Sequence, residues 1–103
     1  MNDQPRETVG MCLMKSDEAD AAIAHLRERS PRIRVEDHLT YFRVEADREL
    51  TLELPEVAAF LGRALTMDSF LVTLSAYFGE IHVDDSVLRI SPVAAAEGDG
   101  VRR

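Results

Sequence analysis

The segment from Met67 to Phe78 is the feature that most restricts the fold of this chain. It carries one charged residue, Asp68, although 30% of all residues are charged. Its apolar residues recur at the spacing of a helix, which predicts a core-facing stripe of Met67, Phe70, Leu71, Leu74 and Phe78. Thr66 is a suitable N-cap for this helix, and Gly79 is a suitable residue to end it.

The opposite side of this predicted helix is small and uncharged. It carries Ser69, Val72, Thr73 and Ala76, where a solvated helix usually has Lys or Glu. Small side chains allow a second helix to approach closely. Two explanations follow: the side docks a protein partner, or the helix is buried on both sides by its own fold.

The first third of the chain predicts a strand, a helix and a second strand. Residues 9–14 form an apolar run with the length of a buried strand. Ser16 is a good N-cap for a helix that ends before Pro31, with acids in its first turn and arginines in its last. The buried stripe of that helix is expected to be Ala19, Ala22, Ile23 and Leu26. Ile33 and Val35 then alternate with arginines as in a strand, and residues 36–38 form a polar corner.

Two hairpins are predicted further along. Between them lie a short helix that begins at Pro55 and is closed by Gly62, and the helix from Met67 to Phe78. In the first hairpin, Phe42 and Val44 are expected to face Leu50 and Leu52 across a turn at residues 47–48. In the second, Ile81 and Val83 are expected to face Leu88 and Ile90 across residues 84–86. The order of elements predicts an α+β fold, a single small domain whose antiparallel β-sheet with hairpins packs against two or three helices.

Length and charge exclude several classes of protein. A chain of 103 residues can form one domain without disulfides, and its single cysteine cannot form one internally. The net charge of -7 disfavours a nucleic-acid partner, because phosphates would be repelled. No apolar run is long enough to span a membrane, and the first nine residues do not resemble a secretion signal, so we expect a cytoplasmic protein.

No catalytic, cofactor-binding or metal-binding residues are predicted. The three histidines lie on different predicted elements without paired spacing, and no Glu precedes a His by three residues. Cys12 lies in an apolar run, where a thiol behaves as a small hydrophobic group. A small enzyme that uses Cys12 or His38 is the least supported alternative. A small-molecule-binding α+β regulatory domain, with the uncharged helix covering a pocket, is a further alternative.

The order of several short motifs resembles a known family, the effector (regulatory or coupling) proteins of bacterial soluble di-iron multicomponent monooxygenases. This family includes the methane monooxygenase regulatory component and the toluene and phenol hydroxylase effectors. The matching motifs lie at residues 15–18, at 35–37 followed by Tyr41, at 61–63, and at 68–72 leading through Ser75 to Gly79. Together they cover residues 9–92, which would be the effector domain. Residues 1–8 would then be a short polar leader and 93–103 a flexible C-terminal tail.

The resemblance implies a non-catalytic protein without a cofactor of its own. Such a protein binds the di-iron hydroxylase component, which holds the di-iron centre, and regulates substrate access, oxygen activation and the coupling of electron use to hydroxylation or epoxidation. We expect the chain to be a monomer when it is not bound. In the family, the end of the last long helix lies against the hydroxylase, which singles out Thr73, Ser75, Ala76 and Tyr77. With the helix surface described above, the expected docking residues are Ser69, Val72, Thr73, Ser75, Ala76 and Tyr77.

Overall fold

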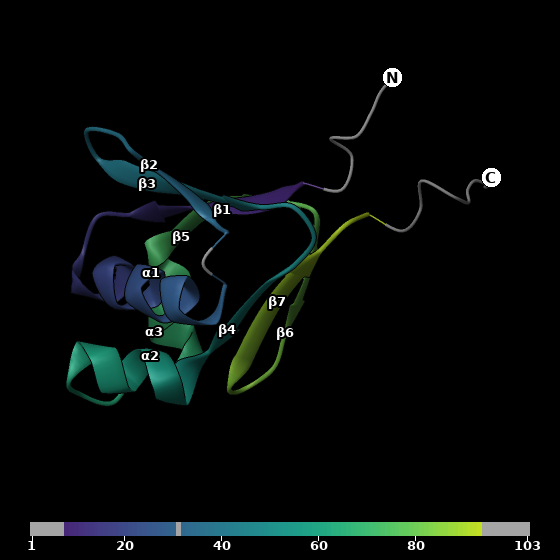
Figure 1. Cartoon of the computed structure of the whole chain (residues 1–103). Coiled ribbons are helices and arrows are strands. Elements are labelled where there is room, and N and C mark those ends of the chain that lie inside the picture. Colours follow the sequence, from purple (N-terminus) through teal and green to yellow (C-terminus); the bar gives the residue numbers. More distant parts are fainter. Residues whose placement is uncertain (1–7, 31, 94–103) are drawn as a thin grey trace, which may run out of the picture.

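The structure is a computed structural model that describes residues 8–30 and 32–93 (Figure 1). Its helices are α1 (Asp17–Arg29), α2 (Leu54–Leu61) and α3 (Met67–Thr73). Its strands are β1 (Val9–Met14), β2 (Arg34–Asp37), β3 (Tyr41–Ala46), β4 (Leu50–Glu53), β5 (Leu74–Phe78), β6 (Glu80–Val83) and β7 (Val87–Ser91). These elements confirm the predicted α+β fold.

The strands form two antiparallel sheets. One has four strands in the order β2-β3-β1-β5, and the other has three in the order β4-β7-β6. Figure 1 shows all three helices on one side of the four-stranded sheet, with the three-stranded sheet standing beside them. We call the other side of the four-stranded sheet its open face. One side of each sheet therefore contributes to a shared core, as in other layered α+β domains.

The core joins both sheets and all three helices. Its fully buried members include Val9, Met11 and Leu13 of β1, Leu26 of α1, Val57 of α2, Phe70 of α3, Leu52 of β4, and Leu88 and Ile90 of β7. The four residues predicted as the buried stripe of α1 are all buried. Burial of large aliphatic and aromatic side chains contributes roughly 1.5 to 3 kcal/mol each, so this cluster is the main source of stability.

Three of the predicted helix caps are present. The hydroxyl of Ser16 accepts a hydrogen bond from the main-chain N–H of Ala19 at 3.0 Å, at the start of α1. Gly62 ends α2 in the left-handed conformation, with φ 84°. Thr66 caps α3 through a 3.1 Å bond from the N–H of Ser69. Each cap satisfies a main-chain group that the helix leaves without a partner.

The prediction of a helix from Met67 to Phe78 is wrong in its second half. The helix ends at Thr73, and Leu74–Phe78 form β5, which pairs with β1. Strand β1 is a central, buried strand, and pairing with β5 satisfies its second row of main-chain groups. Gly79 is therefore not a helix cap. It joins β5 to β6 with φ 118°, and a Cβ there would lie 2.8 Å from the main-chain oxygen of Ser91.

The prediction of a first hairpin between residues 41–44 and 50–54 is also wrong. Strand β3 pairs with β1 and β2, whereas β4 pairs with β7 in the other sheet. Residues 36 and 37, predicted as part of a polar corner, belong to β2. Alternating apolar residues define a strand but not its partner, because every strand with one buried face shows the same pattern. The second hairpin is confirmed, with Ile81 opposite Ile90 and Val83 opposite Leu88.

Candidate functional site

The six predicted docking residues lie around the junction of α3 and β5. Ser69 and Val72 are exposed on α3, and the side chain of Val72 is 81% exposed. Thr73, the last residue of α3, is only 7% exposed and packs inside the fold. Ser75, Ala76 and Tyr77 are exposed on β5. Five of the six residues can therefore contact a partner, and Thr73 supports them from beneath.

These residues do not form the single helix face that the sequence suggests. In an antiparallel pair, residues directly opposite each other project to the same face of the sheet. Tyr77 lies opposite the buried Met11, and Ala76 lies opposite Cys12, the next residue of β1. Tyr77 consequently projects to the helix side of the sheet and Ala76 to the open face. The candidate surface wraps around a sheet edge.

A bulge shapes this edge near Ser75. The register between β1 and β5 shifts between Cys12 and Leu13, so that Leu13 faces Leu74 while Cys12 faces Ala76. The hydroxyl of Ser75 donates a hydrogen bond to the main-chain oxygen of Cys12 at 3.2 Å. A bulge bends a strand and increases its twist, which also protects an exposed edge from unwanted pairing.

Sequence reasoning missed two exposed apolar residues near this junction. Leu39, in the turn between β2 and β3, is 92% exposed, and Met14, at the end of β1, is 48% exposed. Figure 1 shows that this turn, the end of β1 and the start of β5 all lie at the same end of the four-stranded sheet. Single exposed apolar residues are common, but several at one end of a sheet form a candidate interaction surface. Nothing in the local sequence indicates that Leu39 and Met14 lie at the same end of the sheet as the start of β5.

The open face beside β5 carries an arginine that is fixed in place. The guanidinium carbon of Arg43 lies 4.6 Å from the centre of the Phe78 ring, and its Nε donates to a carboxylate oxygen of Glu45 at 2.7 Å. The hydrogen bond to Glu45 is the main cause that raises the pKa of Arg43 above its usual value. This cation has both a carboxylate and a ring as partners, so it is not an unpaired charge beside β5.

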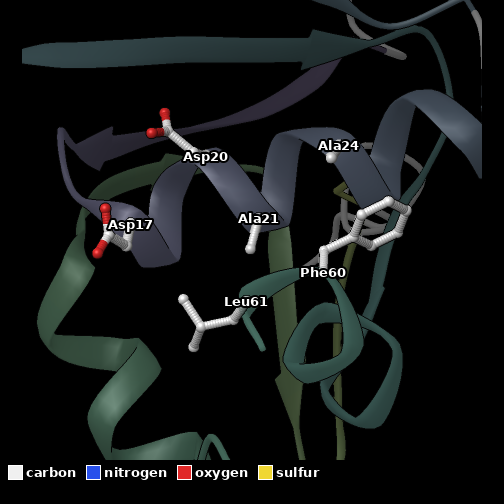
Figure 2. Close-up of a pocket in the computed structure, with 6 residues that line it drawn as sticks. All are labelled: Asp17, Asp20, Ala21, Ala24, Phe60 and Leu61. Carbon is white, nitrogen blue, oxygen red and sulfur yellow. The ribbon is translucent and has the colours of Figure 1, made fainter. Parts of the chain in front are cut away.

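A hollow of about 290 Å³ lies between α1 and α2 (Figure 2). It is lined by Asp17, Asp20, Ala21, Ala24, Phe60 and Leu61. Figure 2 shows Phe60 and Leu61 reaching toward α1, while the carboxylate of Asp20 is turned away from Phe60. A second hollow of about 360 Å³ lies between α1 and strands β2 and β3. Neither hollow is lined by α3, so neither is the ligand pocket that the small-molecule alternative placed beneath that helix.

The residues considered for catalysis have structural partners. His38 stacks on Tyr41, with ring centres 4.6 Å apart, and its Nε2 lies 3.1 Å from a carboxylate oxygen of Glu36. Cys12 is half-buried in β1. Within residues 8–30 and 32–93, no three His, Cys, Asp or Glu side chains converge as a metal site would require. No helix in the same ranges is long and apolar enough to cross a membrane.

Comparison with known proteins identifies similar sequences and folds. A curated relative is the methane monooxygenase regulatory protein B of Methylococcus capsulatus (strain ATCC 33009 / NCIMB 11132 / Bath), which is 28% identical over 82 residues. The match covers 74% of this chain and 58% of that protein, so the chain spans less than two thirds of its relative.

Solved structures share the fold. A chain of a phenol hydroxylase–regulatory protein complex matches with a TM-score of 0.73 at 17% identity, over 82% of this chain and 97% of the other. The soluble methane monooxygenase regulatory protein B matches with a TM-score of 0.65 at 24% identity, over 91% and 70% of the two chains. The model of the MmoB/DmpM family matches residues 7–91. This chain therefore belongs to the MmoB/DmpM family.

Proposed function

We propose that this protein is a non-catalytic effector that binds the di-iron hydroxylase component of a multicomponent monooxygenase. It regulates substrate access and oxygen activation there, and couples electron use to hydroxylation or epoxidation. The match of the family model over residues 7–91 carries this proposal. The similar fold of a chain from a phenol hydroxylase–regulatory protein complex supports it. The effector works in the cytoplasm as a monomer that needs no cofactor, and the di-iron centre belongs to the partner.

The proposed docking surface consists of Ser69, Val72, Ser75, Ala76 and Tyr77, with Met14 and Leu39 extending it at the same end of the sheet. All seven side chains are exposed and uncharged. The centre of a protein interface is typically depleted in charge and contains aromatic residues and Met. Thr73 holds the end of α3 in place beneath this surface and does not touch the partner.

The proposed mechanism is allosteric. The effector binds one conformation of the hydroxylase more tightly than another, and this difference in affinity shifts the equilibrium between them. A coupling free energy of about 1 to 3 kcal/mol is typical of such regulation. An interface of the usual size takes about 800 Å² from each partner, which the junction of α3 and β5 with the adjoining strand ends can supply.

A charge on the docking surface tests this proposal. Adding the wild-type protein to its cognate hydroxylase and reductase should raise the rate of substrate hydroxylation. Val72→Glu should abolish this stimulation and leave the circular dichroism spectrum unchanged, because it puts an unpaired charge into the contact without disturbing the core.

Val83→Glu is the control, since Val83 is an exposed valine at the end of β6, in the three-stranded sheet. It should stimulate like the wild type. Normal stimulation by Val72→Glu would show that the docking surface lies elsewhere. Failure of the wild-type protein to stimulate its hydroxylase would refute the effector function itself.

A further inference from the structure

His25 is the one fully buried histidine among the described residues, and it joins two helices. It lies on the inner side of α1, with no exposed side-chain surface. Its Nε2 accepts a hydrogen bond from the main-chain N–H of Glu53, at 3.2 Å. Its Nδ1 lies 3.4 Å from a carboxylate oxygen of Glu56 and has no hydrogen-bond partner in the described part of the chain.

These contacts replace one half of the capping box at the start of α2. Glu53 is the N-cap residue of α2, its side chain makes no capping hydrogen bond, and Glu56 is the third residue of the helix. In a capping box, the side chain at that third position accepts the N–H of the N-cap residue. Here the imidazole of His25 accepts that N–H, and Glu56 approaches the other ring nitrogen. Helix α1 thus caps α2 through one side chain.

The cap depends on the protonation state of the ring. Nε2 can accept the N–H of Glu53 only while it carries a lone pair, which places the single ring proton on Nδ1, toward Glu56. With a proton on Nε2, the ring N–H and the main-chain N–H of Glu53 would face each other as two donors without an acceptor. We propose that His25 is a pH-responsive latch between α1 and the first turn of α2, closed while the imidazole is neutral and opened by its protonation.

Charged groups on three elements act on this ring. Burial has the largest effect and lowers the pKa of His25 below its ordinary value of 6.5, and Arg29 of α1 lowers it further. Glu56 of α2, Glu53 at the end of β4 and Glu28 of α1 oppose this shift. The open state therefore binds a proton more readily than the closed state. The latch is fully stable above pH 6.5 and weakens as the pH falls from there through the lowered pKa.

Opening loosens only one end of α2, where the N–H of Leu54 still donates to the main-chain oxygen of Ser86 at 2.8 Å. At the other end, Arg63 forms an ion pair with Glu18 of α1, with a nitrogen–oxygen distance of 3.1 Å. The ion pair between Arg29 and Glu53, at 2.7 Å, lies beside the latch and is half-exposed. Protonation of His25 therefore loosens the connection between β4 and α2, while the residues that lead to α3 stay attached to α1.

Nuclear magnetic resonance of the free protein tests the latch directly. Nitrogen shifts at pH 7.5 should show that His25 carries its proton on Nδ1. The hydrogen-exchange protection of the Glu53 amide, corrected for intrinsic exchange, should fall about tenfold per pH unit below pH 6.5. A proton on Nε2 at pH 7.5, or protection that is constant between pH 7 and pH 5, would overturn the proposal.

Variants separate His25 from other titrating groups. His25→Gln keeps an oxygen that can accept the N–H of Glu53 but cannot titrate, so the protection of that amide should no longer depend on pH. His82→Gln is the matched control, because His82 is half-exposed on β6, 3.9 Å from Glu80. In this variant the protection of the Glu53 amide should depend on pH as in the wild type. Loss of that pH dependence in His82→Gln would overturn the proposal. If His25→Gln does not fold, the nitrogen shifts of His25 and the pH dependence of the Glu53 amide in the wild-type protein still test the proposal.

Discussion

The ring of Phe78 covers Gly10 on the open face of the four-stranded sheet. The two residues lie opposite each other in β5 and β1. A Cβ at Gly10 would lie 2.3 Å from Cζ of this ring and 2.5 Å from the main-chain oxygen of Val44. The guanidinium group of Arg43 stacks on the same ring. The missing side chain at Gly10 therefore allows Phe78 to close the sheet surface beside the docking residues.

Replacing Gly10 should consequently destabilise the fold. We expect Gly10→Ala to lower the free energy of unfolding by about 1 to 3 kcal/mol, the range for forcing extra atoms into a packed site. Urea unfolding followed by circular dichroism measures this change. In a Phe78→Ala background the further cost of Gly10→Ala should be smaller but not zero, because the ring is gone while the oxygen of Val44 remains in the way. Unchanged stability of Gly10→Ala would mean that Phe78 does not lie over Gly10.

Neighbouring residues at the end of α3 and in β5 should respond differently to charge. Thr73→Glu buries a carboxylate without a partner, and we expect it to cost about 3 kcal/mol or more of stability. Ala76→Glu places the same charge at an exposed position, so the unfolding free energy should change by less than about 0.5 kcal/mol. Thermal unfolding separates the two variants. Stimulation of the hydroxylase should be lost in Ala76→Glu even though it is folded, and equal stability losses would contradict the burial of Thr73.

Local signals in the sequence predicted three helix caps and the last hairpin correctly. Ser16, Gly62 and Thr66 act within one helical turn, so their roles follow from neighbouring residues alone. The pairing of β6 with β7 depends on a short turn. The pairing of strands that are distant in the sequence could not be predicted from such local signals. Strands β3 and β4 are close in sequence but find partners in different sheets, which alternation of apolar residues does not encode.

The error at α3 and β5 has a related cause. The spacing of apolar residues from Met67 to Phe78 fits a helix, but Val72, Thr73, Tyr77 and Phe78 also favour extended structure. The strand form is favoured because β5 pairs with the free edge of β1. That pairing involves residues that are far apart in the sequence, so no short stretch of sequence reveals it. The candidate docking residues were predicted because the segment carries a single charge and because its end resembles the docking segment of the effector family. Their arrangement around a sheet edge could not be found without the register of β1 and β5.

The N-cap of α1 offers a test of local stability. The Ser16 hydroxyl accepts the N–H of Ala19, and α1 carries much of the buried surface. Ser16→Ala should lower the free energy of unfolding by about 1 kcal/mol. Ser69→Ala is the control, because Ser69 is an exposed residue within α3. It should change the stability by less than about 0.5 kcal/mol. Equal effects of the two changes in chemical denaturation would argue against a capping role for Ser16.

The turn between β6 and β7 should respond to acid through Asp84. One oxygen of its side chain accepts hydrogen bonds from the main-chain N–H groups of Ser86, at 2.9 Å, and Val87, at 2.8 Å. These bonds, that from Ser86 first, lower the pKa of Asp84 below its usual value of 3.8. The ionised side chain therefore stabilises the fold above pH 3.8, and this contribution is lost as the pH falls through the lowered pKa.

Asp84→Asn should therefore reduce the loss of stability between pH 5 and pH 2.5, because the amide oxygen keeps an acceptor that does not titrate. Thermal unfolding across this pH range measures the effect. Asp85→Asn removes the same charge from the same turn, at a side chain without a hydrogen bond in the described part of the chain, and serves as the control. It should retain the acid sensitivity of the wild type. A wild-type acid profile in Asp84→Asn would mean that the two main-chain bonds do not favour the ionised side chain.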